Sequence, residues 1–202
     1  MKIRRRESGF SVRGSRLSFR RRRRQIDWKR YRPTLIWAGQ IIGVILLAFL
    51  IVWSFGFRTT MIGSSMGDTI AESDVVLVNR LSYLISSPSQ GDVVAFLPNG
   101  NEKSHYYIRR IVACPGDVVQ ITDGKLYVND EEYTLGDGDS ITVAGLAEDA
   151  ITLGDDQYFV MGDDPNNSED SRHSGVGLVS KSDILGKVWL IVSPRSHFGP
   201  VD

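Results

Sequence analysis

The chain has 202 residues, 42% of them hydrophobic, which is typical of one domain with a substantial core and room for a subdomain. Its formal net charge is zero, but residues 1–34 carry 14 Lys or Arg against two acids, and the rest carries 10 against 22. This division excludes one evenly neutral surface and indicates that the two parts lie in different environments.

The basic segment, residues 1–34, contains five consecutive arginines at Arg20–Arg24. Such a run is typical of nucleic-acid binding, and also of a segment that sets membrane topology and contacts anionic lipid head groups. The apolar stretch that follows favours the second interpretation. We therefore predict a cytoplasmic tail that contacts membrane lipids and has no nucleic-acid partner.

An apolar segment, LIWAGQIIGVILLAFLIVWSFGF at residues 35–57, contains no charged side chain. At about 1.5 Å per residue, a helix of this length spans roughly 34 Å, enough to cross a hydrocarbon core of about 30 Å. A cleaved signal peptide is the alternative, but its apolar part is shorter, about 7–15 residues, and no A-x-A-like site follows here. Because arginines precede the segment, we predict one transmembrane anchor in the cell membrane, with the N-terminus cytoplasmic and residues 58–202 extracytoplasmic.

Short β-branched and aromatic runs, broken by Gly, Pro, Asp and Asn, recur through residues 58–202. Such runs predict strands, and none has a sustained helical period. The seven clearest are VVLVNRL, DVVAFL, YYIRRIV, DVVQIT, KLYVN, QYFVMG and KVWLIV. Within VVQITDGKLYV, Asp123-Gly124 suits the positive φ angles of a tight hairpin turn. We predict a mostly β domain with an acidic, Gly-rich β insert at about residues 120–158.

Three residues of types that often carry chemistry receive no catalytic role. Cys114 is the only cysteine, so no disulfide forms within the chain. Because it lies between Ala113 and Pro115 in an apolar strand, we predict a small buried side chain. Asp92 and Asp117, each after a glycine, either close turns or belong to the site, and the sequence does not separate these two interpretations.

The segment MIGSSMGDTI, residues 61–70, follows the apolar segment closely. Its glycines let the backbone turn sharply and present the Ser65 hydroxyl next to its own amide. A loop of Ser and Gly alone indicates only a turn. A nucleophile at this place, however, would meet peptides as they leave the membrane.

Three further segments complete a pattern: QGDVVAFL at 90–97, YYIRRIVACPGD at 106–117 and VMGDDPNNSEDSRHSGVGLV at 160–179. In this order, behind an N-terminal anchor, they resemble the type I signal peptidases, the membrane-bound serine proteases that remove signal peptides from exported proteins. The resemblance covers about residues 35–195, and its most specific part is S-x-D-S-R-x-x-G at 168–175. It implies a signal-peptidase-type β fold with a variable β insert.

The resemblance assigns roles to the matching positions. Ser65 falls on the nucleophile and its backbone amide on one oxyanion donor, with Ser64 as site support. Met66 falls beside the substrate pocket, and Gly63 matches the form common in Gram-positive bacteria.

In the last segment, Ser168 falls on the hydroxyl that orients the catalytic lysine. Asp170 and Arg172 fall on a structural ion pair near the site, which an inactive relative would keep as well. The resemblance implies no metal and no cofactor.

Three positions depart from the family pattern. Asp68 replaces a proline close to the nucleophile, and Asp164-Pro165 replaces Asn-Arg in the last segment. Arg109 replaces the catalytic lysine, so the positions of the Ser-Lys dyad hold Ser65 and Arg109.

The third departure bears on mechanism. Lysine, with a pKa near 10.4, becomes a base when burial lowers that pKa by about three units, at a cost of roughly 4 kcal/mol. Arginine starts from a pKa well above that of lysine, and the corresponding shift would cost roughly 8–9 kcal/mol, beyond what burial supplies. We expect Arg109 to stay charged, to donate hydrogen bonds to Ser65 or Ser168, and to fail as a general base.

No other residue is an evident replacement base. His105, four residues earlier on the predicted strand, would lie about 13 Å from Arg109 at roughly 3.3 Å per residue. Lys103 is farther still, and Lys125 belongs to the hairpin. His173, in the last segment, is left as a candidate.

Two functions remain open. The first is a membrane-anchored serine endopeptidase that binds A-x-A-like segments of secreted preproteins by strand addition and cleaves them, with turnover reduced by Arg109. The alternative is a non-catalytic signal-peptidase-like factor that assists the assembly of pilin-type or other surface proteins. A purely structural membrane-anchored β module is a third and more remote interpretation.

Overall fold

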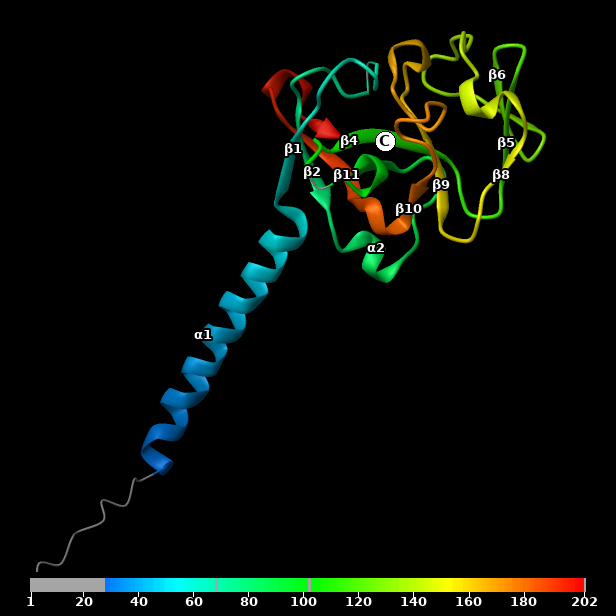
Figure 1. Ribbon diagram of the computed structural model, residues 1–202. Coiled ribbons are helices and arrows are strands. Elements are labelled where there is room, and N and C mark those ends of the chain that lie inside the picture. The colour runs from blue at the N-terminus through cyan, green and yellow to red at the C-terminus, as the bar shows by residue number, and fades with distance from the viewer. Residues whose placement is uncertain (1–27, 68, 102, 202) are drawn as a thin grey trace, which may run out of the picture. The chain divides into compact units, whose positions relative to one another are not determined.

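The computed structural model describes residues 28–67, 69–101 and 103–201. These residues form one long helix, α1 (Trp28–Phe55), and a β-rich domain that follows it in the chain (Figure 1). The arginine run Arg20–Arg24 and Asp68 lie outside the described residues. What was predicted for them stays a prediction.

Helix α1 is apolar over most of its length. Its stretch Tyr31–Phe55, 25 residues, has a mean hydropathy of 2.6, and none of its most apolar part is buried. A helix of this length and composition is able to cross a membrane. The helix begins at Trp28, before the apolar segment 35–57. Its last helical hydrogen bond runs from the N–H of Gly56 to the carbonyl of Val52, and the helix ends at Phe55 because Phe57 begins strand β1.

Two antiparallel sheets make up the described part of the β domain. The larger has the order β1-β2-β11-β3-β4-β9-β10, with β12 paired to β11. Its strands are β1 Phe57–Thr60, β2 Val75–Asn79, β3 Val93–Phe96, β4 Tyr107–Ala113, β9 Gln157–Met161, β10 Val179–Ser180, β11 Ile184–Ser193 and β12 Gly199–Pro200. The smaller has the order β7-β6-β5-β8. Its strands are β5 Val118–Thr122, β6 Lys125–Val128, β7 Glu131–Tyr133 and β8 Ile151–Thr152.

Single helical turns connect some of these strands. They are α2 Ser82–Ile85 and the 3-10 turns η1 Pro98–Gly100, η2 Gly145–Glu148, η3 Pro165–Asn167, η4 Lys181–Asp183 and η5 Arg195–His197. The prediction of a mostly β domain is confirmed, since each of the seven predicted runs overlaps a strand. Strands β1, β7, β8, β10 and β12 were not predicted, because two to four residues are too few to show an alternating pattern.

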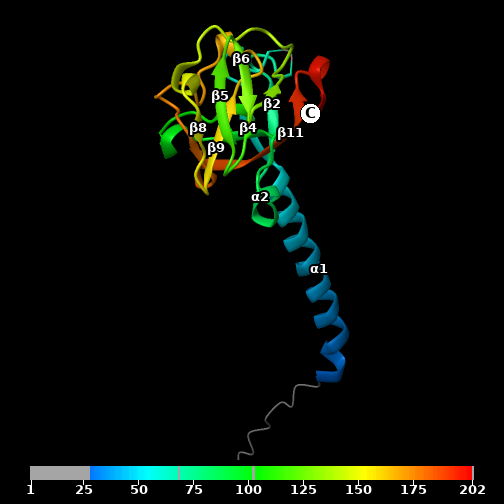
Figure 2. The same ribbon diagram turned by 90° about the vertical axis from the view of Figure 1, so that its right-hand side faces the viewer.

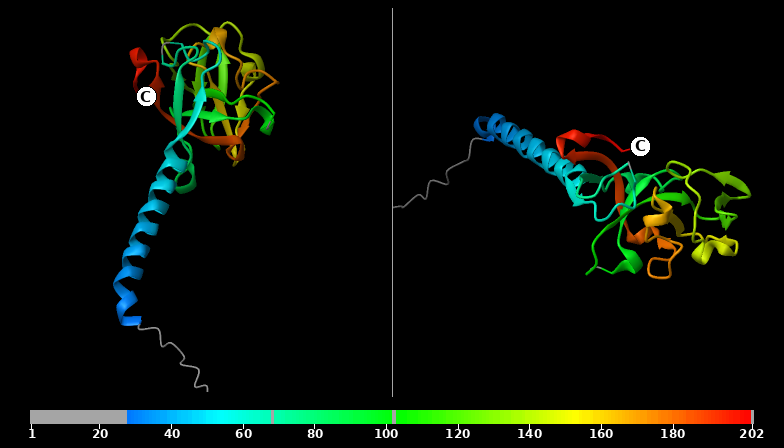
Figure 3. Two further views of the ribbon diagram at one scale, coloured as in Figure 1. Left: turned by 90° about the vertical axis from the view of Figure 1, so that its left-hand side faces the viewer. Right: turned by 90° about the horizontal axis from the view of Figure 1, so that it is seen from above.

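The smaller sheet lies in the region predicted as an insert. At its hairpin, Asp123 and Gly124 have φ angles of 53° and 74°, and Ile121 pairs with Leu126, so the predicted tight turn is confirmed. Figures 1 and 3 place this sheet at one end of the β domain and β12 at the other. Figure 2 looks onto the end that carries β5 and β6.

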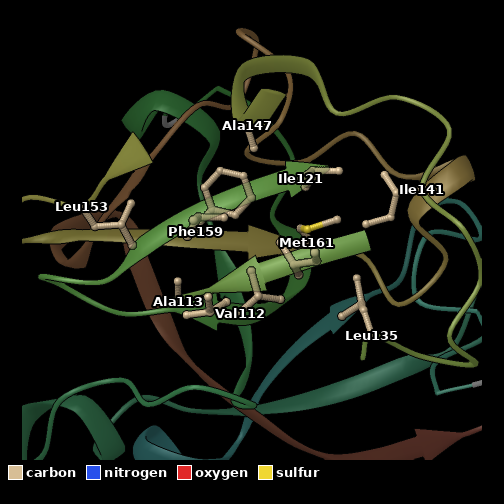
Figure 4. Packing of buried hydrophobic residues seen from close by; sticks show 12 residues of the cluster. Val112, Ala113, Ile121, Leu135, Ile141, Ala147, Leu153, Phe159 and Met161 are labelled. Carbon is tan, nitrogen blue, oxygen red and sulfur yellow. The ribbon is translucent and has the colours of Figure 1, made fainter. Parts of the chain in front are cut away.

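One hydrophobic cluster joins the two sheets. Phe159 and Met161 of β9 pack with Ile121 of β5 and Val112 of β4 (Figure 4), and each of these side chains is at most 3% exposed. Strand β4 pairs with β9 from Arg110 to Ala113. The insert therefore packs against β4, which lies within the segment 106–117, and against β9, which runs into the segment 160–179.

Cys114 differs from its prediction. It follows β4 instead of lying within it, and its side chain is only partly buried. The reason is a turn, in which the Asp117 carboxylate accepts the N–H of Cys114 at 2.8 Å. The Asp92 carboxylate accepts the N–H of Ser89 at 3.0 Å in the same way. Both aspartates therefore close turns, which is one of the two interpretations left open by the sequence.

We expect Phe159→Ala to lower the free energy of unfolding by about 3–5 kcal/mol, because deletion of a fully buried ring leaves a cavity. Val143→Ala is the control, since Val143 is 55% exposed and its truncation should cost less than about 0.5 kcal/mol. Urea unfolding of the full chain in detergent, followed by tryptophan fluorescence, measures both. Similar losses in the two variants would contradict the assignment of this core.

Candidate active site

A cavity of about 280 Å³ lies next to the segment 61–65 and the start of β4. Its lining combines apolar, aromatic and charged side chains. The residues are Met61, Ile62, Gly63, Ser65, His105, Tyr106, Tyr107, Ile108, Arg109, Asn167 and Glu169. The fold thus brings Ser65 and Arg109 to the same cavity.

Ser65 lies in a turn that follows β1. Gly63 and Gly67 flank it with φ angles of 80° and 53°, and the N–H of Gly67 donates to the carbonyl of Ser64 at 3.0 Å. Ser65 is 3% exposed, and its Oγ has no hydrogen-bond partner among the described residues. Ser64 is exposed and serves the turn through its carbonyl. A buried hydroxyl therefore borders the cavity without a base bonded to it.

The structure corrects the place predicted for Met66. Its side chain is fully buried in the hydrophobic core with Ile70 and Val76, and it does not line the cavity. The tight turn directs the residue after Ser65 inward, onto the core. The apolar lining on this side comes from Met61 and other neighbours.

Arg109 is 5% exposed and bonds only to backbone carbonyls among the described residues. Its Nε and Nη2 donate to the carbonyl of Glu169 at 3.0 and 2.7 Å. Its Nη1 donates to the carbonyl of Ile108 at 2.7 Å. The prediction that it donates to Ser65 or Ser168 is wrong, because one carbonyl oxygen accepts two donors of the planar guanidinium together.

The charge state of Arg109 follows from its surroundings. Burial lowers the pKa of the guanidinium, and the Asp170 carboxylate opposes this change. An arginine starts from a very high pKa and is not deprotonated in proteins in practice. Arg109 therefore places a permanent positive charge at the cavity.

Ser168 packs behind Ser65, and Gly162 lies between them. The N–H of Gly162 donates to Ser168 Oγ at 3.1 Å, and the N–H of Asp164 donates to the Ser65 carbonyl at 3.1 Å. A Cβ atom at Gly162 would overlap both the Ser65 carbonyl oxygen and Ser168 Oγ. Gly162 was not predicted as a site residue, since in the sequence it resembles any glycine at the end of a strand.

Asp170 and Arg172 form a buried ion pair. Arg172 Nε lies 2.9 Å from Asp170 Oδ1, and the two side chains are 1% and 0% exposed. The remaining donors of Arg172 reach the carbonyls of Val143 and Pro165. Asp170 Oδ2 also accepts the N–H of Gly162 at 3.4 Å. The pair therefore joins the end of β9 to the last motif and to the segment around residue 143.

A second ion pair, which the sequence did not predict, joins β4 to the loop that follows Ser65. Arg110 Nη2 lies 2.7 Å from Asp163 Oδ2, and the same oxygen accepts the Thr69 hydroxyl at 2.7 Å. Asp163 is 5% exposed. Its neighbour Asp164 instead caps the turn η3, where it accepts backbone N–H groups. Two adjacent aspartates in the sequence do not reveal which of them is paired.

The residues considered as replacement bases form no hydrogen bond with Ser65 Oγ. His105 precedes β4, is exposed and lines the cavity, so the distance of about 13 Å along a strand does not apply to it. His173 Nδ1 lies 3.8 Å from Asp170 Oδ1, outside the cavity lining. Lys103 is exposed, and Lys125 is bonded within the smaller sheet. The described residues also contain no group of His, Cys, Asp or Glu that could hold a metal ion.

Comparison with known proteins gives the family. A signal peptidase I from Enterococcus faecalis V583 aligns in space with a TM-score of 0.40 and 23% identity, over 50% of this chain and 97% of that chain. The family described as "Signal peptidase, peptidase S26" matches residues 35–193. Signal peptidase I P of Bacillus subtilis subsp. natto is 31% identical over 84% of this chain and 94% of its own length. Signal peptidase I S of Bacillus subtilis strain 168 is 34% identical over 79% and 89%. By the family match and these Bacillus relatives, the chain belongs to the type I signal peptidase family.

We expect Gly162→Ala to lower the free energy of unfolding by about 1–3 kcal/mol, because the added methyl group forces Ser65 and Ser168 apart. Gly175→Ala is the matched control, since the nearest atom to its Cβ would be Glu169 Oε1 at 3.8 Å. Thermal unfolding of both variants checks the expectation. Equal stability of the two would show that the close approach at Gly162 is not needed.

Proposed function

We propose that the protein is a membrane-anchored signal-peptidase-type protein whose cavity takes an extended, A-x-A-like segment of an exported preprotein, with Ser65 at the scissile bond. The observation that carries this proposal is the shared cavity of Ser65 and Arg109. Segment 61–63 continues from β1, the edge strand of the larger sheet, and segment 105–106 leads into β4. Both line the cavity, which suits a peptide that binds by strand addition.

Arg109 limits turnover in this proposal. A Ser-Lys dyad needs a neutral amine to take the serine proton, and a guanidinium does not supply one. Ser65 Oγ has no partner among the described residues, and Arg109 is held by the carbonyls of Ile108 and Glu169. Preorganised donors can still stabilise an oxyanion, so slow cleavage is compatible with this site.

A non-catalytic role is the second candidate. The burial of Ser65 and the lack of a hydrogen-bond partner for its Oγ among the described residues favour this role, because a serine without a base suits peptide binding better than hydrolysis. In that role the protein would hold pilin-type or other surface proteins during their assembly. The two candidates share the cavity and differ only in turnover.

The anchor is part of the proposal. Helix α1, with its apolar stretch Tyr31–Phe55, would span the membrane, and the arginines before it would hold the N-terminus in the cytoplasm. The β domain would then face exported proteins on the outer side. Contacts of the arginine run Arg20–Arg24 with anionic lipids would support this orientation.

We expect Arg109→Lys to raise cleavage of an A-x-A-containing preprotein by about 10²–10⁴-fold over the parent protein, the usual contribution of a positioned base. The gain should increase with pH, because burial lowers the pKa of the introduced amine and only its neutral form accepts the proton. Cleavage is measured with the full chain in detergent, and Ser65→Ala gives the background. Rapid cleavage by the parent, abolished in Ser65→Ala, would overturn the assigned role of Arg109.

For topology, we expect protease added to intact spheroplasts to degrade residues 58–202 and to spare an epitope tag at the N-terminus. Alkaline carbonate should leave the chain in the membrane fraction, since α1 would be held in the hydrocarbon core. Detergent-permeabilised cells, in which the tag is digested too, are the control. Release by carbonate, or protection of the β domain, would contradict the proposed anchor.

A further inference from the structure

The cavity contains a buried positive charge that no carboxylate neutralises by direct contact. Arg109 is 5% exposed, and its hydrogen bonds among the described residues all go to carbonyl oxygens. Asp170, the buried acid that acts on the charge of Arg109, is paired with Arg172 at 2.9 Å. These three residues together therefore keep one net positive charge, and an uncompensated buried charge is costly.

Hydrogen-bond donors at the cavity are also left over. A guanidinium has about five N–H donors in a rigid planar fork, and Arg109 uses one each from Nε, Nη1 and Nη2. A second hydrogen on each of Nη1 and Nη2 therefore has no acceptor among the described residues. Ser65 Oγ, 3% exposed and without a partner in those residues, borders the same cavity. The cavity thus offers positive charge and three donors to an incoming group.

We propose that Arg109 and Ser65 hold the C-terminal carboxylate of a bound peptide, so that the cavity recognises a peptide end and not only an internal segment. A carboxylate is planar, accepts the paired donors of a guanidinium, and has lone pairs left for a hydroxyl. The inference rests on the proposed function, because it assumes that a peptide lies in this cavity. Every polypeptide ends in such a carboxylate, and peptide-bond hydrolysis creates a new one, so the ligand is the C-terminal end of a peptide chain.

The charge of Glu169 should affect the binding of a peptide carboxylate in the direction opposite to the charge of Arg109. Its carboxylate belongs to the same lining and accepts a hydrogen bond from the Tyr107 hydroxyl at 3.2 Å. This acid repels a bound carboxylate, but its side chain is exposed and solvent screens the repulsion. Removing its charge should therefore strengthen the binding of a peptide carboxylate, whereas removing the charge of Arg109 should weaken it.

The test compares two fluorescent peptides that end in Ala-Ser-Ala, one with a free carboxylate and one with a carboxamide. Their binding to the full chain in detergent is measured by fluorescence polarisation. We expect the parent to bind the carboxylate peptide at least tenfold more tightly than the carboxamide. Arg109→Gln should abolish this preference, Arg109→Lys should keep it at pH 6, and Glu169→Gln should increase it severalfold. Arg195→Gln, which removes an exposed positive charge away from the cavity lining, should leave it unchanged.

The outcomes separate this inference from the proposed function. Equal binding of the two peptides by the parent would overturn the carboxylate site and leave peptide binding intact. Binding of neither peptide would overturn both proposals. Circular dichroism checks that Arg109→Gln folds. If it does not, the retained preference expected for Arg109→Lys and the increase expected for Glu169→Gln still test the inference.

Discussion

The buried ion pair between Asp170 and Arg172 is the interaction on which the rest of the site depends. Arg172 reaches the carbonyl of Val143 through its side chain and accepts the N–H of Leu146 at its own carbonyl, at 2.9 Å in each case. Asp170 accepts the N–H of Gly162 at the end of β9. Removing one partner would leave the other charge buried alone, so the two residues hold these segments together as a unit.

Two adjacent arginines on β4, Arg109 and Arg110, have different partners and different roles in the site. Successive side chains of a strand point to opposite faces, so Arg109 and Arg110 meet different surroundings. Arg110 forms an ion pair with Asp163 and thereby holds the loop after Ser65. Arg109 borders the cavity and is held by the carbonyl of Glu169. A change at Arg109 would therefore alter the charge at the cavity, and a change at Arg110 would alter the position of the loop after Ser65.

The site therefore combines the architecture of a peptidase family with a charge that its usual mechanism does not need. Ser65 lines the cavity with Arg109, Gly162 packs closely against Ser65 and Ser168, and Asp170 is paired with Arg172. A guanidinium cannot act as the base, yet it is well suited to hold a carboxylate or to polarise a carbonyl. In the two proposals made for this site, the loss of a base and the gain of an anion site both follow from the presence of an arginine at position 109.

Local pattern was sufficient to predict the long apolar helix, the longer strands and the Asp123-Gly124 hairpin, because each depends on neighbouring residues. The motifs also pointed to Ser65 and Arg109 as the positions that matter. Contacts between distant segments were not predictable, since strand register and loop packing decide them. The inward turn of Met66, the carbonyl partners of Arg109 and the position of His105 before β4 belong to this group. Only the tertiary structure shows that Arg109 is buried with carbonyl oxygens as its hydrogen-bond partners, because the buried acid Asp170 is already paired with Arg172.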